Sequence, residues 1–200
     1  MELRRILDEN DEKFLVKSFK ESKTMVLLSD TVYGISSSLR SLAIKNIYKI
    51  KKRDKSKLFI ILVSDLLMLK KYFFVSSQQD FFIKKSLSDK NSRAISFILK
   101  PKKDLLFFLD NNYKNGAAVR LPKNEFLIKI IKLLKEPIIS TSCNVSGEAT
   151  LNNLSKIKKF FKDRLYKPDF IISYPGFKPR KRPSKIIDIR DINNIKNIRI

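Results

Sequence analysis

The hydrophobic and polar positions of this chain follow two periods, which predict two kinds of element. Apolar residues recur at helical spacing in several segments, so amphipathic helices are expected at residues 11–22, 42–52, 65–73, 78–87, 125–134 and 154–165. Short apolar runs bounded by turn residues predict strands at residues 24–28, 58–63, 94–99, 117–121, 138–139, 169–173, 185–189 and 197–200. Because strands alternate with helices without an internal repeat or a domain-sized linker, we expect one α/β domain over residues 1–200, with its core at 11–200.

A polar segment follows one of the predicted strands. The stretch from Lys135 to Glu148 begins with the apolar pair Ile138 and Ile139 and continues into a dense run of hydroxyl and amide side chains closed by Gly147. Loops at the ends of buried strands are where α/β folds place ligands, so this run is a candidate binding segment. An ordinary polar turn explains the same residue types, since Ser, Asn and Gly are common turn formers.

A second candidate segment combines the polar residues 29–34 with cations that follow the predicted helix 42–52. Cations at a helix C-terminus have a structural explanation, since each complements the helix dipole by about 0.3–1 kcal/mol. Lys51 and Arg53 are two residues apart and would face different directions on a continuous helix. If Lys51, Arg53 and Lys57 bind one polyphosphate, the chain must therefore leave the helix near Arg53.

Composition limits the partners and the catalytic mechanisms that are compatible with this chain. The chain has 43 Lys and Arg against 20 Asp and Glu, a formal net charge of +23, which favours an anionic partner such as a nucleic acid, a nucleotide or a membrane surface. Lysine is abundant throughout, so general composition explains part of this excess. The absence of histidine excludes Ser-His-Asp and Cys-His catalysis, and the one cysteine excludes an intramolecular disulfide. No apolar stretch approaches the roughly 18 residues of a membrane span, so we expect a soluble cytoplasmic protein without a membrane partner.

Short motifs in a fixed order resemble those of a known family. They are Asp-Thr-Val-Tyr-Gly at 30–34, Ile-Tyr-Lys-Ile-Lys-Lys-Arg at 47–53 with Lys57, Ala-Val-Arg at 118–120, Ser-Thr-Ser-Cys-Asn-Val-Ser-Gly at 140–147 and Pro-Ser-Lys-Ile-Ile-Asp at 183–188. This order resembles the YrdC/TsaC family of L-threonylcarbamoyladenylate synthases, in its short single-domain form. The resemblance covers nearly the whole chain, from about Phe14 to Arg199.

The resemblance implies a fold and an activity. The expected fold is a YrdC-like twisted open mixed sheet flanked by helices, with a deep basic groove. The expected enzyme is a nucleotidyltransferase that makes threonylcarbamoyl-AMP and pyrophosphate from ATP, L-threonine and bicarbonate, for threonylcarbamoyladenosine modification of tRNA. A downstream threonylcarbamoyl transferase complex is an expected partner, and so is tRNA or double-stranded RNA.

The same resemblance assigns roles to individual side chains. Lys51 and Arg53 are the expected catalytic cations and would bind the phosphates of ATP. The rest of the expected ATP site is Ser142, Asn144 and Arg199, and the expected threonine site is Thr31, Lys57, Arg120 and Ser184. No protein metal site is expected, because Mg²⁺ would be held through phosphate oxygens. Attack of a carbamate oxygen on the α-phosphorus needs charge neutralisation and alignment more than a protein acid or base.

The chain departs from the family pattern in several places, among them Asp54, an acid beside the expected phosphate site where proline is usual. The usual Pro-Gly-Pro-x-Thr is replaced by Ser-Arg-Ala-Ile-Ser at 92–96, so Arg93 stands where glycine is usual. Cys143 replaces a typical alanine and is expected to be a small buried spacer rather than a nucleophile, because no histidine can activate it.

The alternative to an enzyme is a non-catalytic module that binds double-stranded RNA or ribosomal precursors. Both hypotheses predict a positive concavity, and the basic run 178–182 is interpreted either as a solvated loop or as an RNA-facing patch. Only the enzyme requires that Lys51, Arg53, Ser142 and Asn144 converge on one small-molecule pocket.

Overall fold

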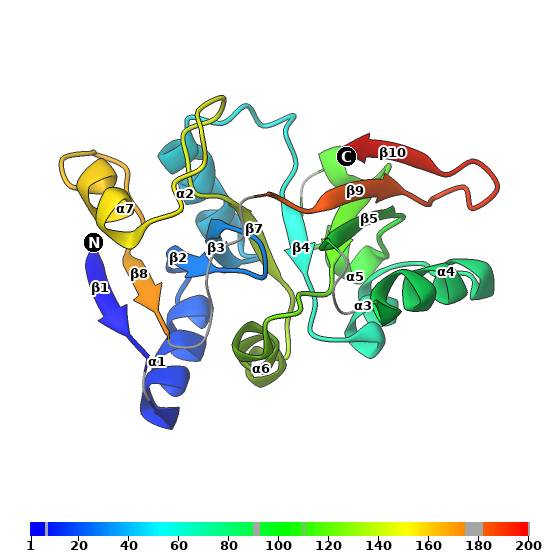
Figure 1. The fold of residues 1–200 in the computed structure, drawn as a ribbon, viewed down its shortest axis with the longest axis horizontal. Coiled ribbons are helices and arrows are strands. Elements are labelled where there is room, and N and C mark those ends of the chain that lie inside the picture. Colours follow the sequence, from blue (N-terminus) through cyan, green and yellow to red (C-terminus); the bar gives the residue numbers. More distant parts are fainter. Residues whose placement is uncertain (7, 90–92, 110, 175–181, 200) are drawn as a thin grey trace.

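One mixed sheet runs through the protein. The structure, a computed structural model, describes residues 1–6, 8–89, 93–109, 111–174 and 182–199. Their strands form a 10-stranded sheet in the order β1-β8-β2-β3-β7-β4-β6-β5-β9-β10 (Figure 1). The strands are β1 Glu2–Arg5, β2 Met25–Leu28, β3 Tyr33–Ser38, β4 Ile60–Leu62, β5 Ile95–Leu99, β6 Ala117–Arg120, β7 Ile138–Ser142, β8 Phe170–Ser173, β9 Lys185–Asp188 and β10 Lys196–Arg199.

Most of the described helices begin at a side-chain cap, whereas α2 and α5 do not. They are α1 Glu9–Lys20, α2 Ser41–Lys51, α3 Leu66–Tyr72, α4 Ser77–Ser88, α5 Lys103–Leu106, α6 Glu125–Leu134 and α7 Leu154–Phe161, with a 3₁₀ turn at Asn111–Tyr113. The side chains of Asp8, Asp65, Asn124 and Asn153 each accept a bond from the first turn of a helix. Such bonds satisfy backbone N–H groups that have no partner inside the helix.

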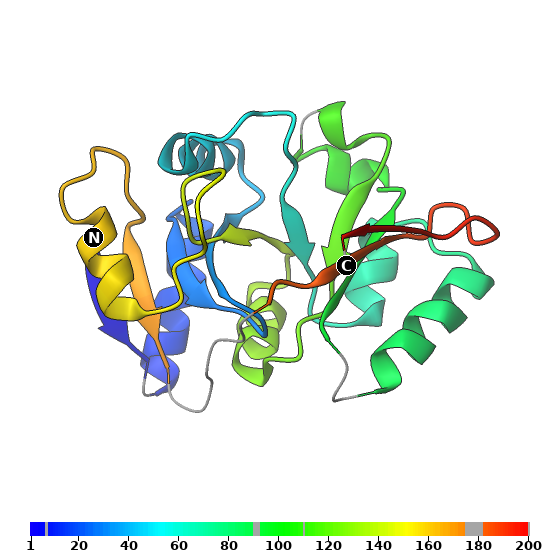
Figure 2. The ribbon, with the colours of Figure 1, turned by 45° about the horizontal axis from the view of Figure 1, so that its top comes forward.

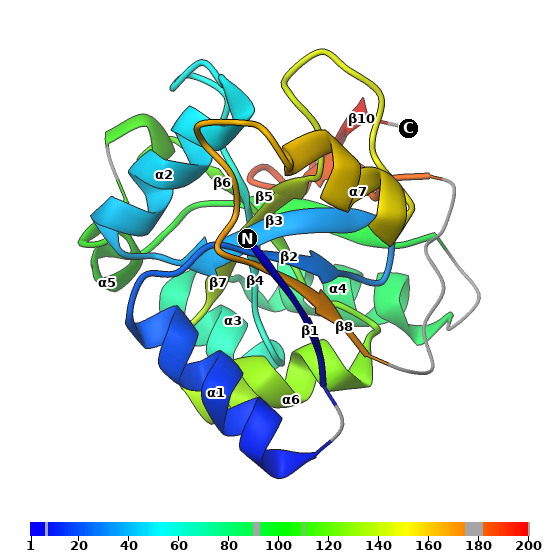
Figure 3. The ribbon, with the colours of Figure 1, turned by 90° about the vertical axis from the view of Figure 1, so that its left-hand side faces the viewer.

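Two apolar layers hold the helices on the sheet. Helices α1 and α6 lie side by side on one face (Figure 3), where Leu15 and Ile131 pack in one cluster with Met25 of β2. Helices α2 and α7 lie on the other face, where Ile47 packs in a second cluster with Val26 of β2. Met25 and Val26, neighbours in β2, thus pack on opposite faces of the sheet. Because both faces of this strand are buried, it has no polar residue.

The central strands bring the motif residues together. Strands β3, β7, β4 and β6 are adjacent in the sheet, although they come from distant parts of the chain. Gly34 of β3 pairs with Ser142 of β7, Ile60 of β4 pairs with Ser140 of β7, and Leu62 of β4 pairs with Arg120 of β6. The segment after α2 and the loop after β7 project on the same side of the molecule (Figure 2).

The predicted elements are all present in the described residues, with ends shifted by a few positions, but β3 was not expected. Residues 29–34 were interpreted as a polar segment, and no element was predicted for residues 35–38, which include Ser36, Ser37 and Ser38. The strand is nevertheless buried throughout. The Ser36 hydroxyl donates to Ser140 Oγ at 2.9 Å, and the Ser37 hydroxyl donates to the Lys23 carbonyl at 3.2 Å. These partners across the fold allow serine to occupy a buried strand.

Other differences are smaller. Strand β7 continues to Ser142, so the first hydroxyl residues after Ile139 belong to the strand and not to a loop. Helix α7 ends at Phe161, so the prediction of a helix to residue 165 was wrong, and Leu165 is exposed. Strand β1, helix α5 and the 3₁₀ turn were not predicted. The expected strand end at residue 200, residue 92 and most of the basic run 178–182 lie outside the described residues.

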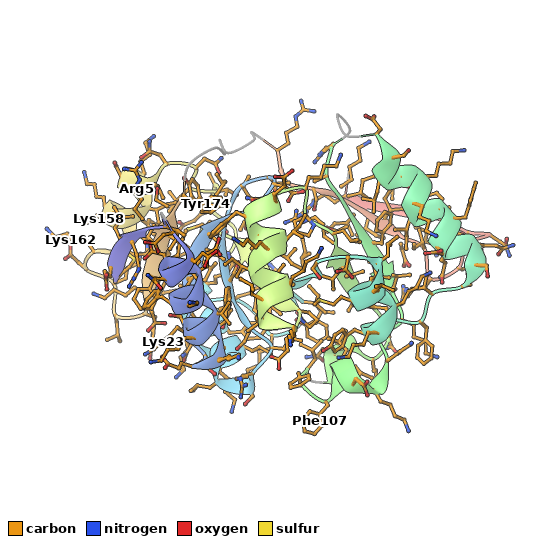
Figure 4. The ribbon with its side chains drawn as sticks, turned by 90° about the horizontal axis from the view of Figure 1, so that it is seen from below. Arg5, Lys23, Phe107, Lys158, Lys162 and Tyr174 are labelled. Carbon is orange, nitrogen blue, oxygen red and sulfur yellow. The ribbon has the colours of Figure 1, made fainter. Side chains whose placement is uncertain are left out.

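Part of the positive charge lies on the outer surface. Arg5, Lys158 and Lys162 gather at the end of the molecule formed by β1 and α7 (Figure 4), and all three are exposed. Phe107 is also exposed and points away from the body of the protein (Figure 4). None of the described helices is long and apolar enough to cross a membrane.

Candidate functional site

A polar pocket opens where the central strands end. Its volume is about 270 Å³, and its walls come from the β2–β3 turn, the segment after α2, β6, β7, the segment before β9, and β10. Arg53, Arg120 and Arg199 reach this pocket together with hydroxyl groups, and no carboxylate lines it among the residues that the structure describes. A lining of guanidinium and hydroxyl groups suits an anionic ligand.

A larger hollow of about 490 Å³ lies between α4 and the segment before β10. It is lined by Phe81, Phe82, Ile192 and Ile195 with neutral polar residues, and no charged residue lines it within the described part of the chain. Chemistry on charged substrates therefore belongs to the smaller, polar pocket.

The pocket contains most of the expected site residues. The following predicted side chains line it: Thr31, Arg53, Arg120, Ser142, Ser184 and Arg199. Lys51, Lys57 and Asn144 are not among its lining residues. Lys51 and Asn144 lie directly behind the wall, whereas Lys57 is exposed on the segment after α2.

Lys51 is fully buried and holds the loop that follows β7. Its ammonium group donates to the carbonyl oxygens of Ser142 and Asn144 at 2.5 and 2.8 Å, and to Asn144 Oδ1 at 2.6 Å. The Ser146 backbone N–H donates in turn to the Lys51 carbonyl. Burial and the neighbouring charge of Arg53 lower the pKa of Lys51 to about 8.

The chain leaves helix α2 at the point that the cation spacing required. Lys52 is in the left-handed conformation, with φ 47° and ψ 44°, and ends the helix. Arg53 is therefore free of the helical direction, and its Nε and Nη2 donate to the carbonyls of Lys57 and Leu58, both at 2.8 Å. The Arg53 guanidinium is held by backbone oxygens rather than by an acid. Burial lowers the pKa of Arg53.

Ser142 and Asn144 form a bonded pair at the end of β7. The Ser142 hydroxyl donates to Asn144 Oδ1 at 2.8 Å, and Asn144 Nδ2 donates to the Glu148 carbonyl at 2.6 Å. Because Lys51 also donates to this amide oxygen, both ends of the Asn144 side chain are already bonded. Asn144 thus shapes the loop, and Ser142 faces the pocket.

A buried ion pair of Asp30 and Arg120 lies beside Thr31. Arg120 Nη2 lies 3.5 Å from Asp30 Oδ1, and Arg120 Nη1 donates to Thr31 Oγ1 at 3.3 Å. Asp30 Oδ2 accepts from the Lys123 backbone N–H at 3.2 Å. Arg120 and Asp30 are almost wholly buried, and Arg120 Nε has no hydrogen-bond partner among the described residues. Asp30 opens the motif at 30–34, but no role was predicted for its side chain.

Ser184 and Arg199 form the opposite wall. Arg199 Nε donates to the Ser184 carbonyl at 2.9 Å, and its Nη2 donates to Ser184 Oγ at 3.1 Å. The Ser184 hydroxyl is also 3.0 Å from Ser96 Oγ. Burial lowers the pKa of Arg199, and the charges of Arg120 and Arg93 lower it further.

Gly34 leaves room for the hydroxyl of Ser140 at the pocket wall. A Cβ at position 34 would lie 2.6 Å from Ser140 Oγ and 3.0 Å from the Thr141 carbonyl oxygen. Both distances are shorter than normal contacts, so the glycine in this motif is required by close packing between β3 and β7.

The described residues offer no cluster of side chains typical of a protein-held metal site. No cluster of three or more Asp, Glu or Cys side chains that could hold a metal occurs in the described ranges. Asp30 is buried against Arg120 and is not a lining residue. Cys143 is buried too, and burial raises the pKa of its thiol to about 12, as befits a spacer rather than a nucleophile.

The mixed sheet and its helices define an α/β protein, and its pocket has a lining that suits an anionic ligand. The fold is that of the Escherichia coli YciO crystal structure, with a TM-score of 0.82, 22% identity and coverage of 99% of this chain and 92% of that one. It is also that of P. abyssi Sua5 complexed with L-threonine, with a TM-score of 0.77, 22% identity and coverage of 94% and 53%. The expected twisted mixed sheet flanked by helices is therefore confirmed.

Sequence comparison places the chain in a family. The family model of Sua5, YciO and YrdC, described as telomere recombination, matches residues 17–200. A threonylcarbamoyl-AMP synthase from Wigglesworthia glossinidia brevipalpis is 28% identical over 145 residues, which are 72% of this chain and 74% of the relative. The chain belongs to the Sua5/YciO/YrdC family.

Proposed function

We propose that this protein is an L-threonylcarbamoyladenylate synthase, which makes threonylcarbamoyl-AMP and pyrophosphate from ATP, L-threonine and bicarbonate. One observation carries the proposal. Motif residues that are far apart in the sequence, Thr31, Arg53, Arg120, Ser142, Ser184 and Arg199, line one pocket. A relative from the same family is named threonylcarbamoyl-AMP synthase, and a neighbouring structure holds L-threonine.

The nucleotide lies against the wall built by α2 and β7. The carbamate formed from threonine and bicarbonate attacks the α-phosphorus of ATP, the bond to the β-phosphate oxygen breaks, and pyrophosphate leaves. Arg53 binds the phosphates through the guanidinium edge that its bonds to Lys57 and Leu58 leave open. Lys51 acts beside it by fixing the loop in which Ser142 faces the ligand.

The amino acid lies against the wall built by Thr31, Arg120 and Ser184. Arg120 Nε, which has no partner in the described part of the protein, is a buried donor available to the threonine carboxylate. Thr31 and Ser184 offer neutral hydroxyls on either side. Lys57 is exposed, so we assign it only a contribution at the rim.

Mg²⁺ enters this proposal through the substrate. The pocket offers arginines and hydroxyls rather than carboxylates, so the ion would be held by the phosphate oxygens of ATP, where it would neutralise part of their charge. The residues of the chain supply the remaining positive charge.

The product is an activated adenylate, so a downstream transferase must consume it in the tRNA modification. We propose a threonylcarbamoyl transferase complex in the cytoplasm as that consumer. Exposed cations such as Lys158 and Lys162 would attract tRNA or double-stranded RNA by charge.

Pyrophosphate release tests the enzymatic proposal. The purified protein should release pyrophosphate from ATP when both L-threonine and bicarbonate are present, and omission of either should return release to background. Release that is unchanged without threonine would contradict the synthase. A non-catalytic RNA-binding module would give no release under any of these conditions.

A further inference from the structure

Arg93 stands next to the pocket, outside the set of residues assigned above. It precedes β5, is partly buried, and its Nε donates to the Pro183 carbonyl at 2.8 Å. Pro183 and the next residue, Ser184, both line the pocket. Glycine is usual at this position in the family pattern, so the guanidinium is a feature of this chain.

Arg93 is held in the same way as two arginines of the pocket. Arg53 Nε donates to the Lys57 carbonyl, and Arg199 Nε donates to the Ser184 carbonyl. A guanidinium fixed at Nε keeps a defined direction while other N–H groups remain available for a ligand. Arg93 and Arg199 use the carbonyls of the consecutive residues Pro183 and Ser184, so their guanidinium groups flank the backbone that leads into β9.

No acid in the described part of the chain balances the positive charge of Arg93 and Arg199 beside Pro183 and Ser184. Neither Arg93 nor Arg199 forms an ion pair with an acid among the described residues, whereas Arg190 is bonded to Asp188. The charge of Arg93 also contributes to the lowered pKa of Arg199, as expected for like charges held close together. An anion bound beside Pro183 and Ser184 would reduce this repulsion between Arg93 and Arg199.

We infer that Arg93 and Arg199 form an anion subsite beside Pro183 and Ser184. Arg93 is thus a further residue that binds the polyphosphate of the nucleotide. This inference rests on the proposed function for the identity of the nucleotide, but the subsite itself is defined by the two guanidinium groups. Its ligand class is a polyphosphate: the triphosphate of ATP or the pyrophosphate that leaves.

A purely structural role for Arg93 makes a different prediction. If the side chain serves only to fix Pro183, its removal should lower the melting temperature and leave anion affinity unchanged. Arg93→Gly restores the residue usual in the family and removes both charge and anchor. Arg93→Lys keeps the charge but loses the fork of N–H groups.

The experiment is equilibrium binding of inorganic tripolyphosphate to the full chain at several salt concentrations. Arg164→Ala is the matched control, because Arg164 Nε also donates to a backbone carbonyl, that of Phe160, and Arg164 does not line the pocket. We expect Arg93→Gly to weaken tripolyphosphate binding about tenfold and to reduce its salt dependence, while Arg93→Lys recovers part of the loss. Arg164→Ala should bind as the wild type does.

Two results would overturn the subsite. The first is equal tripolyphosphate affinity in Arg93→Gly and wild type. The second is an equal loss of affinity in Arg93→Gly and Arg164→Ala, which would indicate unspecific charge attraction. Because the probe is not turned over, the result is independent of catalysis. A protein that loses tripolyphosphate affinity on Arg93→Gly yet never releases pyrophosphate from ATP would retain the subsite and lose the proposed function. In an active enzyme, Arg93→Gly should raise the KM for ATP about tenfold.

Discussion

The ammonium group of Lys51 lies 2.6 Å from Oδ1 of Asn144, 93 positions further along the chain. The motif that contains Lys51 predicts a cation at the phosphates, but its side chain is fully buried and its bonds run to the backbone and amide of the loop after β7. Lys51 therefore fixes the end of β7 and the loop that follows it, and with them the orientation of Ser142. Of Lys51 and Arg53, it is Arg53 that lines the pocket.

Replacement of Lys51 by methionine should destabilise the protein. The Lys51→Met side chain fills a similar space but leaves the carbonyls of Ser142 and Asn144 without their donor. Unsatisfied buried acceptors cost about 1–3 kcal/mol each, so we expect a loss of about 2 kcal/mol or more in the free energy of unfolding. Urea denaturation measures this change. An unaltered midpoint would show that the ammonium does not hold the loop.

The pH dependence of stability provides a second test of Lys51. Its pKa falls from 10.5 in an unperturbed lysine to about 8 in the folded protein, so between these pH values the unfolded chain binds more protons. Stability from this group therefore rises with pH in that window, by at most about 1.4 kcal/mol per pH unit. The stability difference between wild type and Lys51→Met should grow from pH 8 towards 10.5. A difference that stays constant would contradict the lowered pKa.

Arg53→Ala should separate catalysis from folding. Loss of a cation at the phosphates should lower pyrophosphate release about tenfold or more, while the melting temperature stays nearly unchanged. Arg40→Ala is the control, since Arg40 is exposed at the start of the same helix and caps it with no side-chain bond. A large drop in melting temperature with activity retained would show Arg53 to be structural.

Asp30→Asn tests the buried pair with Arg120. The change removes the charge that faces Arg120 and leaves the guanidinium buried without a counterion, which should destabilise the fold by about 3 kcal/mol. Added inorganic phosphate should restore part of the loss by pairing with Arg120. Asp80→Asn, which affects a carboxylate paired with the exposed Lys70 and Lys84, should cost much less. Equal effects of the two variants would argue against a special role for Asp30.

Gly34→Ala tests the close packing at the pocket wall. The new methyl group would meet Ser140 Oγ at 2.6 Å, so we expect a loss of about 1–3 kcal/mol in stability. Adding Ser140→Ala should recover part of this loss but not all, because the Thr141 carbonyl remains 3.0 Å away. Thermal unfolding of both single variants and the double variant measures the coupling. Additive effects would show that the two positions do not interact.

Local pattern was sufficient for much of the fold. Helix α6 occupies the predicted residues, because its apolar stripe packs against α1 and Asn124 caps its first turn. Helix α2 ends before Arg53, where we expected the chain to leave the helix if Lys51, Arg53 and Lys57 bind one polyphosphate. Strand β3 could not be predicted in this way, because the bond between the hydroxyls of Ser36 and Ser140 depends on strands that meet only in the folded chain.

The site was less accessible from the sequence. The family resemblance assigned Thr31, Ser142 and Ser184 to the site, and all three line the pocket. It did not distinguish Lys51, which lies behind the wall, from Arg53, which lines it, because that difference depends on where α2 ends. Asp30 and Arg93 act through partners in distant segments, Arg120 and Pro183, which no local pattern relates to them.

Formation of labelled threonylcarbamoyl-AMP tests the central claim most directly. The protein is incubated with ATP, L-threonine and ¹³C-bicarbonate, and the adenylate is analysed by mass spectrometry. We expect the wild type to form threonylcarbamoyl-AMP that carries the label, and Arg53→Ala to form much less of it. Hydrolysis of ATP without this adduct, or an adduct formed equally well by Arg53→Ala, would contradict it.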